Sequence, residues 1–559
     1  MTNKDIAAVL QETADLIELT DGNPHRARAF SRAARSVDDL DEDVSSRLSA
    51  STLTEVGGIG DAMADHIADI ARSGTFALHD ELLNAIPPGL LDVLRVNGLG
   101  TKRTRRLWQE LDITSLDELE SAAEADHITD LSGFGDKTQQ NILENVRRLR
   151  SYESQWRYAE VWTAVAPLLD TLRDHKAVTR AEPTGPLRRA LETLEQIDLI
   201  VATEAPDAVQ DALEDALSAD VEAEDARLTG TLAEGIPLRV HLASPSSFGT
   251  AWWQTTGAEA HCSALEDATG TPDEHTDEDA LYEAAGYAFI PPELRENRGE
   301  LKAAAEGSLP TLITTDDLQG SLHNHSTYSD GADSLRAMAE AAHDKGFSYF
   351  GICDHSQSLQ IAGGLSPDAV RQQQKEINQL NNEFADDGLN FRIFSGIESD
   401  ILRDGSLDYK DDVLDTFDFV VASVHTGFSM TEAEATDRVI QAVRNPYTRI
   451  LGHPTGRLLL SREGYPLDHA RVIDACAEAG VAIELNANPY RLDLDWRWVR
   501  HATDQGVLIS INPDAHATSE LDYVRWGVAV ARKGWLSAAD CLNAKSRSDF
   551  EEWLSADAA

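Results

Sequence analysis

The stretch SLHNHSTYSDG (Ser321–Gly331) begins a C-terminal region in which apolar runs of strand length alternate with helical stretches. Seven such runs end near His325, Cys353, Ser395, Val424, Gly452, Leu485 and Ile511. Helical periodicity separates most of them, as at Ser334–Lys345, Pro367–Ala385 and Asp468–Ala479. Strands that alternate with helices usually run parallel and are joined by crossover helices. The region after about Gln319 is therefore predicted to be a β/α barrel or a doubly wound sheet.

Histidine and acidic side chains stand at or just after the ends of these runs. The first two histidines alternate along the first run, so both are expected on one face of a strand. The full set is His323, His325, Asp330, His355, Glu398, His425, His453, Asp514 and His516. Strand C-termini meet at one mouth of a β/α barrel, and imidazoles and carboxylates bind Zn²⁺, Mn²⁺ or Fe²⁺. Six histidines and three carboxylates exceed the needs of one ion, so the sequence predicts two or three metal ions.

Closely spaced metal ions indicate phosphoester hydrolysis, because they lower the pKa of a bound water and stabilise both the attacking and the leaving oxygen. One His-x-His pair alone is more often part of a polar strand, so the hypothesis depends on all nine residues together. His343, His469 and His501 lie within helical stretches and are interpreted as surface or structural residues.

A glycine-hairpin motif occurs three times near the N-terminus, as VGGIGDAMADHI (Val56–Ile67), VNGLGTKRTRRLW (Val96–Trp108) and LSGFGDKTQQNI (Leu131–Ile142). Each copy follows one helical stretch and precedes another. Such hairpins direct backbone N–H groups at phosphates without reading the base sequence. The predicted DNA-binding residues are Gly58, Gly60, Gly98, Gly100, Lys102, Arg103, Gly133, Gly135 and Lys137.

The net charge is −49, from 48 basic and 97 acidic residues. Such acidity normally opposes binding to nucleic acid, since phosphates repel carboxylates. We favour adaptation to a salty, halophilic cytoplasm over avoidance of DNA. Molar salt shortens the Debye length to ~3 Å, which leaves DNA binding possible through short-range contacts.

Several features predict a cytoplasmic protein without a membrane partner. No apolar run approaches the ~20 residues needed to cross a bilayer, and the N-terminus does not have the pattern of a secretory signal. The four cysteines are widely spaced and form no CxxC pair. This spacing argues against a disulfide framework or a cysteine zinc site and favours a reducing compartment.

The motifs HNHSTYSDG, ICDHS, SGIESDIL, SVHTGF, LGHPTGR, ELNANP and NPDAH resemble the PHP (polymerase and histidinol phosphatase) domain family over about Gln319–Ala559. The resemblance implies a distorted seven-stranded β/α barrel with three metal ions. It would place one ion with His323, His325, Glu398 and Asp514, a second with Glu398, His425 and His453, and a third with Asp330, His355 and His516. Glu398, Asp514 and His425 are the expected catalytic residues. Arg457 is either a phosphate contact or an ordinary salt-bridge residue.

The segments TGPLRRALETLEQIDLIV (Thr184–Val201), FGTAWWQTTGAEAH (Phe248–His261) and YAFIPPELRENRGE (Tyr287–Glu300) resemble motifs of family X DNA polymerases. With the hairpins and the PHP-like region, nearly the whole chain resembles a bacterial or archaeal, DNA polymerase beta-like family X polymerase. The implied fold is multidomain: a helical helix-hairpin-helix region, an α+β nucleotidyltransferase palm and thumb, and a distorted (β/α)7 barrel. The expected domains are 1–84 (helix-hairpin-helix), 85–150 (tandem helix-hairpin-helix fingers), 151–235 (degenerate palm), 236–310 (thumb-like) and 319–559 (PHP).

The palm departs from the family pattern where metal ions would bind. The family has Asp-x-Asp on one strand and a third Asp on a neighbouring strand, whereas this chain has Gln196, Asp198 and, by spacing, Arg239. An amide and a guanidinium cannot replace two anionic ligands of the Mg²⁺ pair that nucleotidyl transfer needs. The polymerase site is therefore predicted to be inactive. Mg²⁺ would be expected at the palm only if the polymerase site were active.

Two further departures concern nucleotide and abasic-sugar chemistry. Gly185-Pro186 replaces the family's Gly-Ser, although Arg188 and Arg189 remain and, with Asp198, are the expected nucleotide and cofactor contacts. In relatives, a lysine after the first hairpin forms a Schiff base with an abasic sugar. The aligned residues here are Ala62 and His66, and neither can act as that amine nucleophile, so no lyase activity is predicted through that position.

The favoured interpretation is a family X polymerase-like DNA repair protein, a monomer, that hydrolyses phosphodiesters in 3′→5′ trimming or 3′-end cleaning. Its expected partner is gapped, 3′-ended or single-stranded DNA. Three alternatives stay open: an active gap-filling polymerase with a PHP exonuclease, a non-enzymatic DNA-binding scaffold, and a small-molecule phosphatase.

Overall fold

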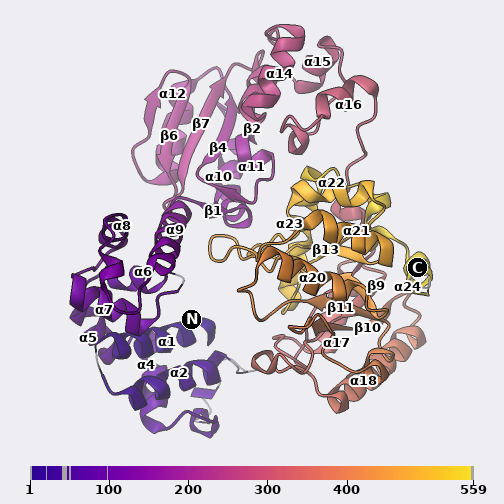
Figure 1. The fold of residues 1–559 in the computed structure, drawn as a ribbon. Coiled ribbons are helices and arrows are strands. Elements are labelled where there is room, and N and C mark those ends of the chain that lie inside the picture. Colours follow the sequence, from indigo (N-terminus) through magenta and orange to yellow (C-terminus); the bar gives the residue numbers. More distant parts are fainter. Residues whose placement is uncertain are drawn as a thin grey trace. The chain divides into compact units, whose positions relative to one another are not determined.

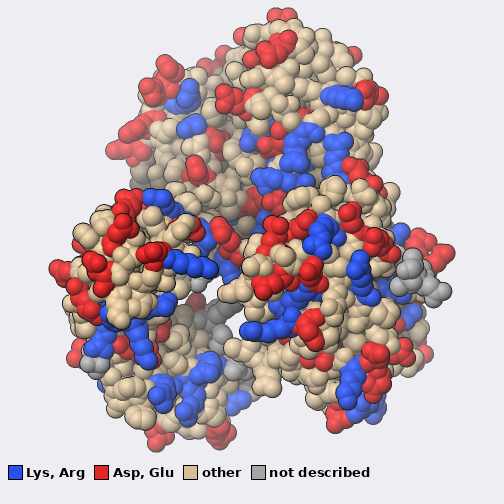
Figure 2. Space-filling model, viewed as in Figure 1, with Lys and Arg blue, Asp and Glu red and all other residues tan. Residues whose placement is uncertain are grey.

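The computed structural model describes residues 3–20, 22–38, 40, 44, 47–48, 52–96 and 98–555, so Asn97 of the second hairpin copy lies outside the described residues (Figure 1). The chain forms two compact units, Met1–Ser154 and Gln155–Ala559. Figure 2 shows acidic and basic side chains in scattered groups over the visible surface. Within the described residues, no helix is both long and apolar enough to cross a membrane.

The first unit is helical, as predicted. Its α-helices are α1 (Asn3–Leu19), α2 (Pro24–Asp38), α4 (Asp61–Ser73), α5 (Ala77–Ala85), α6 (Leu90–Leu94), α7 (Thr101–Leu111), α8 (Leu116–Glu124) and α9 (Asp136–Glu153). Each long helix buries one apolar stripe, which is how an amphipathic helix gains stability from packing. Ile6, Phe30 and Ile67 belong to one hydrophobic cluster, and Leu107 and Ile142 belong to another.

The second unit begins with a palm-like α+β region. A small antiparallel pair joins β1 (Trp156–Arg157) to β3 (Thr193–Leu194). A five-stranded mixed sheet has the order β2-β4-β7-β6-β5, with bounds Arg180–Pro183, Ile197–Ala202, Pro237–Ala243, Arg227–Thr231 and Glu222–Glu224. The helices here are α10 (Tyr158–Asp174), α11 (Gly185–Arg188) and α12 (Pro206–Leu217). The apolar run IDLIVA (Ile197–Ala202), whose composition is typical of a strand, forms β4, and it is buried along its whole length.

A helical segment follows, formed by α13 (Phe248–Thr256), α14 (Glu259–Thr269), α15 (Glu278–Ala284) and α16 (Glu300–Glu306). The polar composition of residues 266–279 predicts a loop there, but this prediction is wrong at both ends, because α14 continues to Thr269 and α15 begins at Glu278. Leu265 and Leu281 are buried in the local hydrophobic cluster. The polar residues between them therefore include exposed helix faces as well as the connection at 270–277.

The C-terminal region is a seven-stranded parallel sheet in the order β14-β13-β12-β11-β10-β9-β8. In chain order, β8 to β14 span Gly320–Ser321, Tyr349–Ile352, Arg392–Asp400, Phe419–Ser423, Thr448–Leu451, Ala482–Asn486 and Ile509–Asn512. A parallel bridge between Asn324 and Ala515 joins the two ends of the sheet, so the barrel is nearly closed. The predicted distorted seven-stranded barrel is confirmed.

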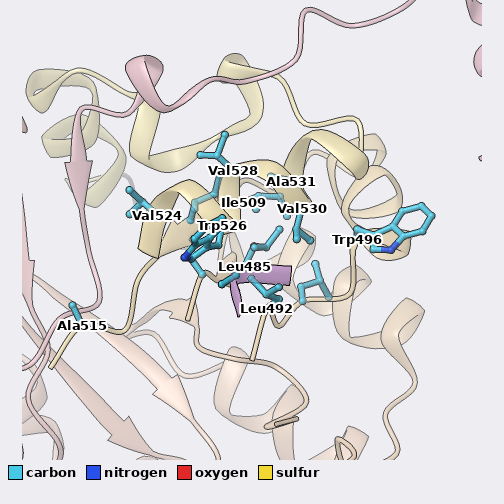
Figure 3. Close-up of a cluster of buried hydrophobic side chains, with 14 of the residues drawn as sticks. Leu485, Leu492, Trp496, Ile509, Ala515, Val524, Trp526, Val528, Val530 and Ala531 are labelled. Atoms are coloured by element: carbon cyan, nitrogen blue, oxygen red, sulfur yellow. The ribbon is translucent and has the colours of Figure 1, made fainter. Parts of the chain in front are cut away.

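Helices cover the outside of the barrel (Figure 1). They are α17 (Leu335–Asp344), α18 (Pro367–Asp386), α19 (Asp411–Leu414), α20 (Glu432–Val443), α21 (His469–Ala479), α22 (Trp496–Asp504), α23 (Val524–Lys533) and α24 (Arg547–Ser555). The three helices predicted from periodicity are α17, α18 and α21. Figure 3 shows Trp526 and Val530 of α23 among buried side chains that include Leu485 and Leu492. This packing fixes the segment that leaves β13.

Two strand ends differ from the predictions. Strand β8 ends at Ser321, so His323 and His325 lie beyond it, on either side of the bridge at Asn324. Strand β10 continues to Asp400, so Glu398 lies inside a strand and not after it. The long strand brings this carboxylate into the middle of the barrel mouth.

Candidate metal centre

Nine side chains that lie in or after six of the seven strands meet at the barrel mouth, and Glu398 lies at their centre. Five imidazoles have a ring nitrogen within 4 Å of its carboxylate. The distances are 3.4 Å for His323, 3.8 Å for His325, 2.8 Å for His355, 3.2 Å for His425 and 2.9 Å for His453. Residues that are up to 130 positions apart in the sequence thus share one carboxylate.

The two remaining carboxylates lie against three of the same imidazoles and against the sixth, His516. Asp514 lies 3.1 Å from His325 and 3.7 Å from His323. Asp330 lies 3.4 Å from both His355 and His516. Three groups of these side chains each offer ligand atoms within 4.8 Å of one another: His325, Asp330, His355 and His516; His323, His325 and Asp514; and His355, Glu398 and His425.

Unsatisfied polar atoms indicate that the site is built for cations. His323 Nε2, His325 Nδ1, His355 Nδ1 and Glu398 Oε2 are buried and have no hydrogen-bond partner. His355 Nδ1 and Glu398 Oε2 are 2.8 Å apart, yet their angles do not make a hydrogen bond. Buried polar atoms are rarely left without partners, and imidazole nitrogens beside carboxylates are the donor set of divalent transition metals. The residues therefore fit two or more metal ions.

The charged groups of the cluster change one another's pKa. Burial would raise the pKa of Glu398, but the charges of His425, His323 and His355 outweigh it and hold this pKa well below its ordinary value. Burial would lower the pKa of His516, but the hydrogen bond to Asp330 and the charge of Asp514 raise it to about 9.

Two buried carboxylates behind the cluster hold the histidine rings, and sequence reasoning missed both. Glu484 accepts a hydrogen bond of 2.7 Å from His323 Nδ1, and Asp400 accepts one of 2.5 Å from His425 Nδ1. These bonds leave the Nε2 atom of each ring directed at Glu398. Outer carboxylates of this kind fix the tautomer and orientation of metal-binding histidines. An acidic residue inside the apolar run AIELN was the available signal for Glu484.

The backbone is strained at two of the predicted ligands. His453 has a φ of 20° and Asp514 has a φ of 53°, although neither is glycine. Left-handed backbone is costly for such residues and persists where the surroundings enforce it, often at functional sites.

The other histidines singled out in the sequence lie away from the centre. His343 is on α17, and its ring packs edge-on against Phe391 at 5.5 Å. His469 stacks on Trp498 at 4.9 Å, and His501 contacts the same tryptophan at 5.7 Å. These contacts agree with the structural role predicted for them.

The three glycine hairpins have nearly the same backbone. The first glycines, Gly58, Gly98 and Gly133, have φ values of 96°, 87° and 90°. The second glycines, Gly60, Gly100 and Gly135, cap α4, α7 and α9 with φ between −96° and −94° and ψ between 171° and 176°. Nothing lies within 4 Å of a Cβ built on any of these second glycines. Each hairpin therefore presents open backbone at a helix N-terminus, the geometry that binds anions.

The comparisons with known proteins agree with this arrangement. Residues 1–76 match the helix-hairpin-helix domain, residues 90–148 match the SAM-like helix-hairpin-helix tandem, and residues 321–488 match the PHP domain. The chain is 34% identical over 575 residues to the DNA polymerase/3'-5' exonuclease PolX of Bacillus subtilis, covering 99% of each chain. The chain belongs to the PolX family. A probable phosphatase of Acetivibrio thermocellus is 29% identical over 36% of this chain and 80% of its own.

In this PolX chain, the structure brings the altered palm residues together. Strands β4 and β7 pair in parallel with Asp198 opposite Arg239. The Gln196 amide donates to both oxygens of Asp198, each at 2.9 Å. Arg239 Nη1 lies 3.6 Å and His241 Nε2 lies 3.4 Å from Asp198 Oδ1. The Asp198 carboxylate is thus surrounded by an amide, a guanidinium and an imidazole.

The two retained palm arginines of this PolX protein have carboxylate partners of their own. Arg188 forms a two-pronged pair with Glu278, at 2.8 and 2.6 Å, and packs against Trp252 at 3.4 Å. Arg189 donates to Glu296 at 2.8 Å and to the backbone oxygen of Thr256. Both guanidinium charges are compensated within the protein.

The first hairpin domain of this PolX protein has no amine at the aligned lyase positions. The His66 ring stacks on that of Phe30 at 5.8 Å and is tilted against that of Phe76 at 4.6 Å, and the two phenylalanine rings stack on each other at 5.8 Å. Its pKa is lowered by burial and by the charge of Arg26. Its ring is part of an aromatic cluster.

Proposed function

We propose that this PolX protein hydrolyses DNA phosphodiester bonds at the barrel mouth, in 3′→5′ trimming or 3′-end cleaning. The convergence of six imidazoles and three carboxylates on one barrel mouth, with buried ligand atoms left unsatisfied, carries the proposal. The exonuclease named in the Bacillus subtilis relative supports it. The hairpins support DNA as the substrate, because they offer backbone N–H groups to phosphates.

The ions would be held by the nine residues named above, of which Glu398 lies within 4 Å of five imidazoles. Divalent ions bound there acidify water and stabilise the charge of phosphate oxygens. The chain's own part is to fix the ligands. Glu484 and Asp400 hold the Nδ1 atoms of His323 and His425, so each ring presents Nε2 to the centre. His/carboxylate sites accept Mn²⁺, Zn²⁺ or Fe²⁺.

We further propose that the palm does not transfer nucleotides. Two anionic ligands are missing, and Arg239 places a positive charge where a divalent ion would bind, since it lies 3.6 Å from Asp198. The hydroxyl expected from the family's Gly-Ser is replaced by Pro186. Arg188 and Arg189 would have to leave Glu278 and Glu296 in order to hold a triphosphate.

The polymerase activity named in the Bacillus subtilis relative favours a second candidate, an active gap-filling polymerase. Primer extension on gapped DNA with Mg²⁺ or Mn²⁺ separates the two. We expect no incorporation above background. Robust incorporation that Asp198→Ala abolishes would refute the loss of this activity.

The hydrolase proposal is tested on 5′-labelled, 3′-recessed and flapped DNA at high salt, with each metal in turn. We expect Glu398→Gln to lower the rate by at least about a thousandfold, since metal assistance contributes several kcal/mol. Glu383→Gln is the matched control, because this carboxylate is exposed on α18 and pairs with Arg336. Failure of the metal-loaded wild type to release nucleotides or phosphate overturns the proposal.

A further inference from the structure

Arg491 is a guanidinium beside the metal centre that none of the predicted roles uses. It lies on the connection after β13, and its Nε atom is 3.5 Å from Asp514 Oδ2. Its side chain is 19% exposed, and its two terminal nitrogens form no hydrogen bond within the described part of the chain. No other described lysine or arginine has a nitrogen within 4 Å of the carboxylate oxygens of Asp330, Glu398 or Asp514.

The backbone around Arg491 is held firmly. Arg491 and Leu492 both donate their N–H to the backbone oxygen of Asn488, at 2.8 and 3.0 Å. Leu492 is buried and has a φ of 43°. A strained, buried backbone of this kind persists only where its surroundings over-determine it, so the side chain of Arg491 leaves the loop at a fixed place.

Arg457, the arginine singled out in the sequence, is occupied in holding this loop. Its Nε donates to the backbone oxygen of Arg491 at 2.9 Å, and its Nη2 donates to the backbone oxygen of Leu492. The same guanidinium lies 3.3 Å from Glu192 and 3.5 Å from Asp495. Its donors are directed at the protein, whereas those of Arg491 are available to a ligand.

A second arginine adds positive charge near Arg491. Arg462 donates to the backbone oxygen of Gly456 and lies over the ring of Phe428 at 4.1 Å. Burial and then the charge of Arg491 lower the pKa of Arg462. Two guanidiniums that disfavour each other's charge provide an environment that favours an anion.

We propose that Arg491 binds a non-bridging oxygen of the substrate phosphate, and that Arg457 is a positioning residue that acts through the backbone of Arg491. The planar fork of a guanidinium matches the paired oxygens of a phosphate. The side chain stands beside Asp514, one of the residues that would hold the ions, so the phosphate would be bound between fixed positive charges. This inference rests on the proposed hydrolysis of phosphodiesters.

The test uses the full chain loaded with Mn²⁺ and compares Arg491→Gln and Arg491→Lys with wild type. Arg471→Gln is the matched control, because it removes an exposed guanidinium that pairs with Asp437 on the outer helices. We expect Arg491→Gln to lower kcat/KM on 3′-recessed DNA by about 10²–10³-fold, the usual effect of losing one donor to a developing oxyanion. Arg491→Lys keeps the charge but not the fork, and it should recover part of the loss.

Two further readouts separate this inference from its alternatives. Bound manganese, measured by mass spectrometry, should stay at the wild-type level in Arg491→Gln. Binding of inorganic phosphate, measured by calorimetry, should weaken at least tenfold. If Arg491→Gln instead alters manganese binding and leaves phosphate binding and kcat/KM unchanged, Arg491 only neutralises Asp514 and the inference fails.

Phosphate binding also separates failure of this inference from failure of the proposed function. If the wild-type protein does not cleave DNA but binds phosphate in a way that depends on Arg491, the proposed function fails and the phosphate site stands. If Arg491→Gln cleaves DNA at the wild-type rate, the proposed function stands and the role of Arg491 fails.

Discussion

Glu484 shows how a single residue can decide the geometry of the barrel centre without being one of its nine expected ligands. It is fully buried and receives four hydrogen bonds, all from donors: His323 Nδ1 at 2.7 Å, the His453 backbone N–H at 3.0 Å, and the amides of Asn486 and Asn512 at 2.9 and 3.0 Å. A carboxylate satisfies four donors, since it has two oxygens and no proton to place.

We expect Glu484→Gln to weaken metal binding by about 10–100-fold, the usual effect of losing an outer partner of a ligating histidine. The new NH₂ group has to face a donor, which leaves a buried polar group unsatisfied at about 1–3 kcal/mol. Metal affinity is measured by competition with a chelating dye, and stability by thermal unfolding.

Glu376→Gln is the control for this substitution, because that carboxylate accepts only the Tyr328 hydroxyl among the hydrogen bonds of the described residues. Unchanged metal affinity in Glu484→Gln would show that the His323 ring is held by packing alone.

At the scale of the element, the three hairpins share one backbone conformation in the turn between two helices. The first glycine supplies a φ near 90° that side chains other than glycine rarely adopt. The second glycine has ordinary extended backbone and caps the following helix. The first glycine of a hairpin is therefore needed for the turn itself, whereas the second keeps the helix N-terminus open. Alanine substitutions at the two positions should have different effects.

Gly133→Ala is expected to destabilise the first unit by about 1–2 kcal/mol, because alanine is strained at a φ of 90°. Gly135→Ala is expected to leave stability nearly unchanged, since its φ is −94° and its Cβ would meet nothing within 4 Å. Its methyl group would nevertheless stand where a phosphate approaches, so DNA affinity should fall in both variants. Thermal unfolding and fluorescence anisotropy with a gapped duplex measure the two effects.

An effect of Gly135→Ala on stability with none on DNA affinity would contradict the proposed phosphate contact of the hairpin.

At the scale of the whole molecule, buried charges tie α23 of the barrel to the palm and thumb within the second unit. Lys533 is 1% exposed and donates to the backbone oxygen of Arg189 at 3.0 Å and to Glu296. Arg189 shares that carboxylate. Burial lowers the pKa of Lys533 to about 8, although Glu296 opposes this change. Arg189, in a segment that resembles a family X motif, is therefore part of a contact with the barrel helix α23.

We expect Glu296→Gln to lower the free energy of unfolding of the second unit by about 3–5 kcal/mol, because the buried Lys533 and Arg189 lose their shared counter-charge. Scanning calorimetry measures the change. Adding Lys533→Met to Glu296→Gln should recover part of the lost free energy of unfolding, because substitutions of two residues in direct contact do not have additive effects.

Glu306→Gln is the control, since Glu306 belongs to an exposed pair with Lys302 at 3.9 Å and should contribute little. A transition in Glu296→Gln that coincides with wild type would show that these charges do not connect the domains. The proposed adaptation of this acidic chain to salt stays a prediction at the same scale.

The sequence by itself determined the alternation of parallel strands with helices and the nine candidate ligands, and the resemblance of its motifs to PHP domains selected a barrel over a doubly wound sheet. Alternating strand and helix periodicity predicts parallel strands, and residues that follow such strands meet at one end of the barrel. His355 and His425 were found in this way without any knowledge of their neighbours. The exact strand ends were not predictable, because β8 is replaced after Ser321 by a single bridge at Asn324 and β10 continues past Glu398.

Only the tertiary structure decided which charged side chains are free and which are occupied. Arg457 and Arg491 are both arginines on barrel loops, yet one donates to backbone oxygens and the other faces Asp514. Likewise, Arg188 is compensated by Glu278, which lies 90 residues away in the sequence. Periodicity and spacing are local properties of the chain, whereas the partner of a charge depends on which distant segments the fold brings within a few ångströms.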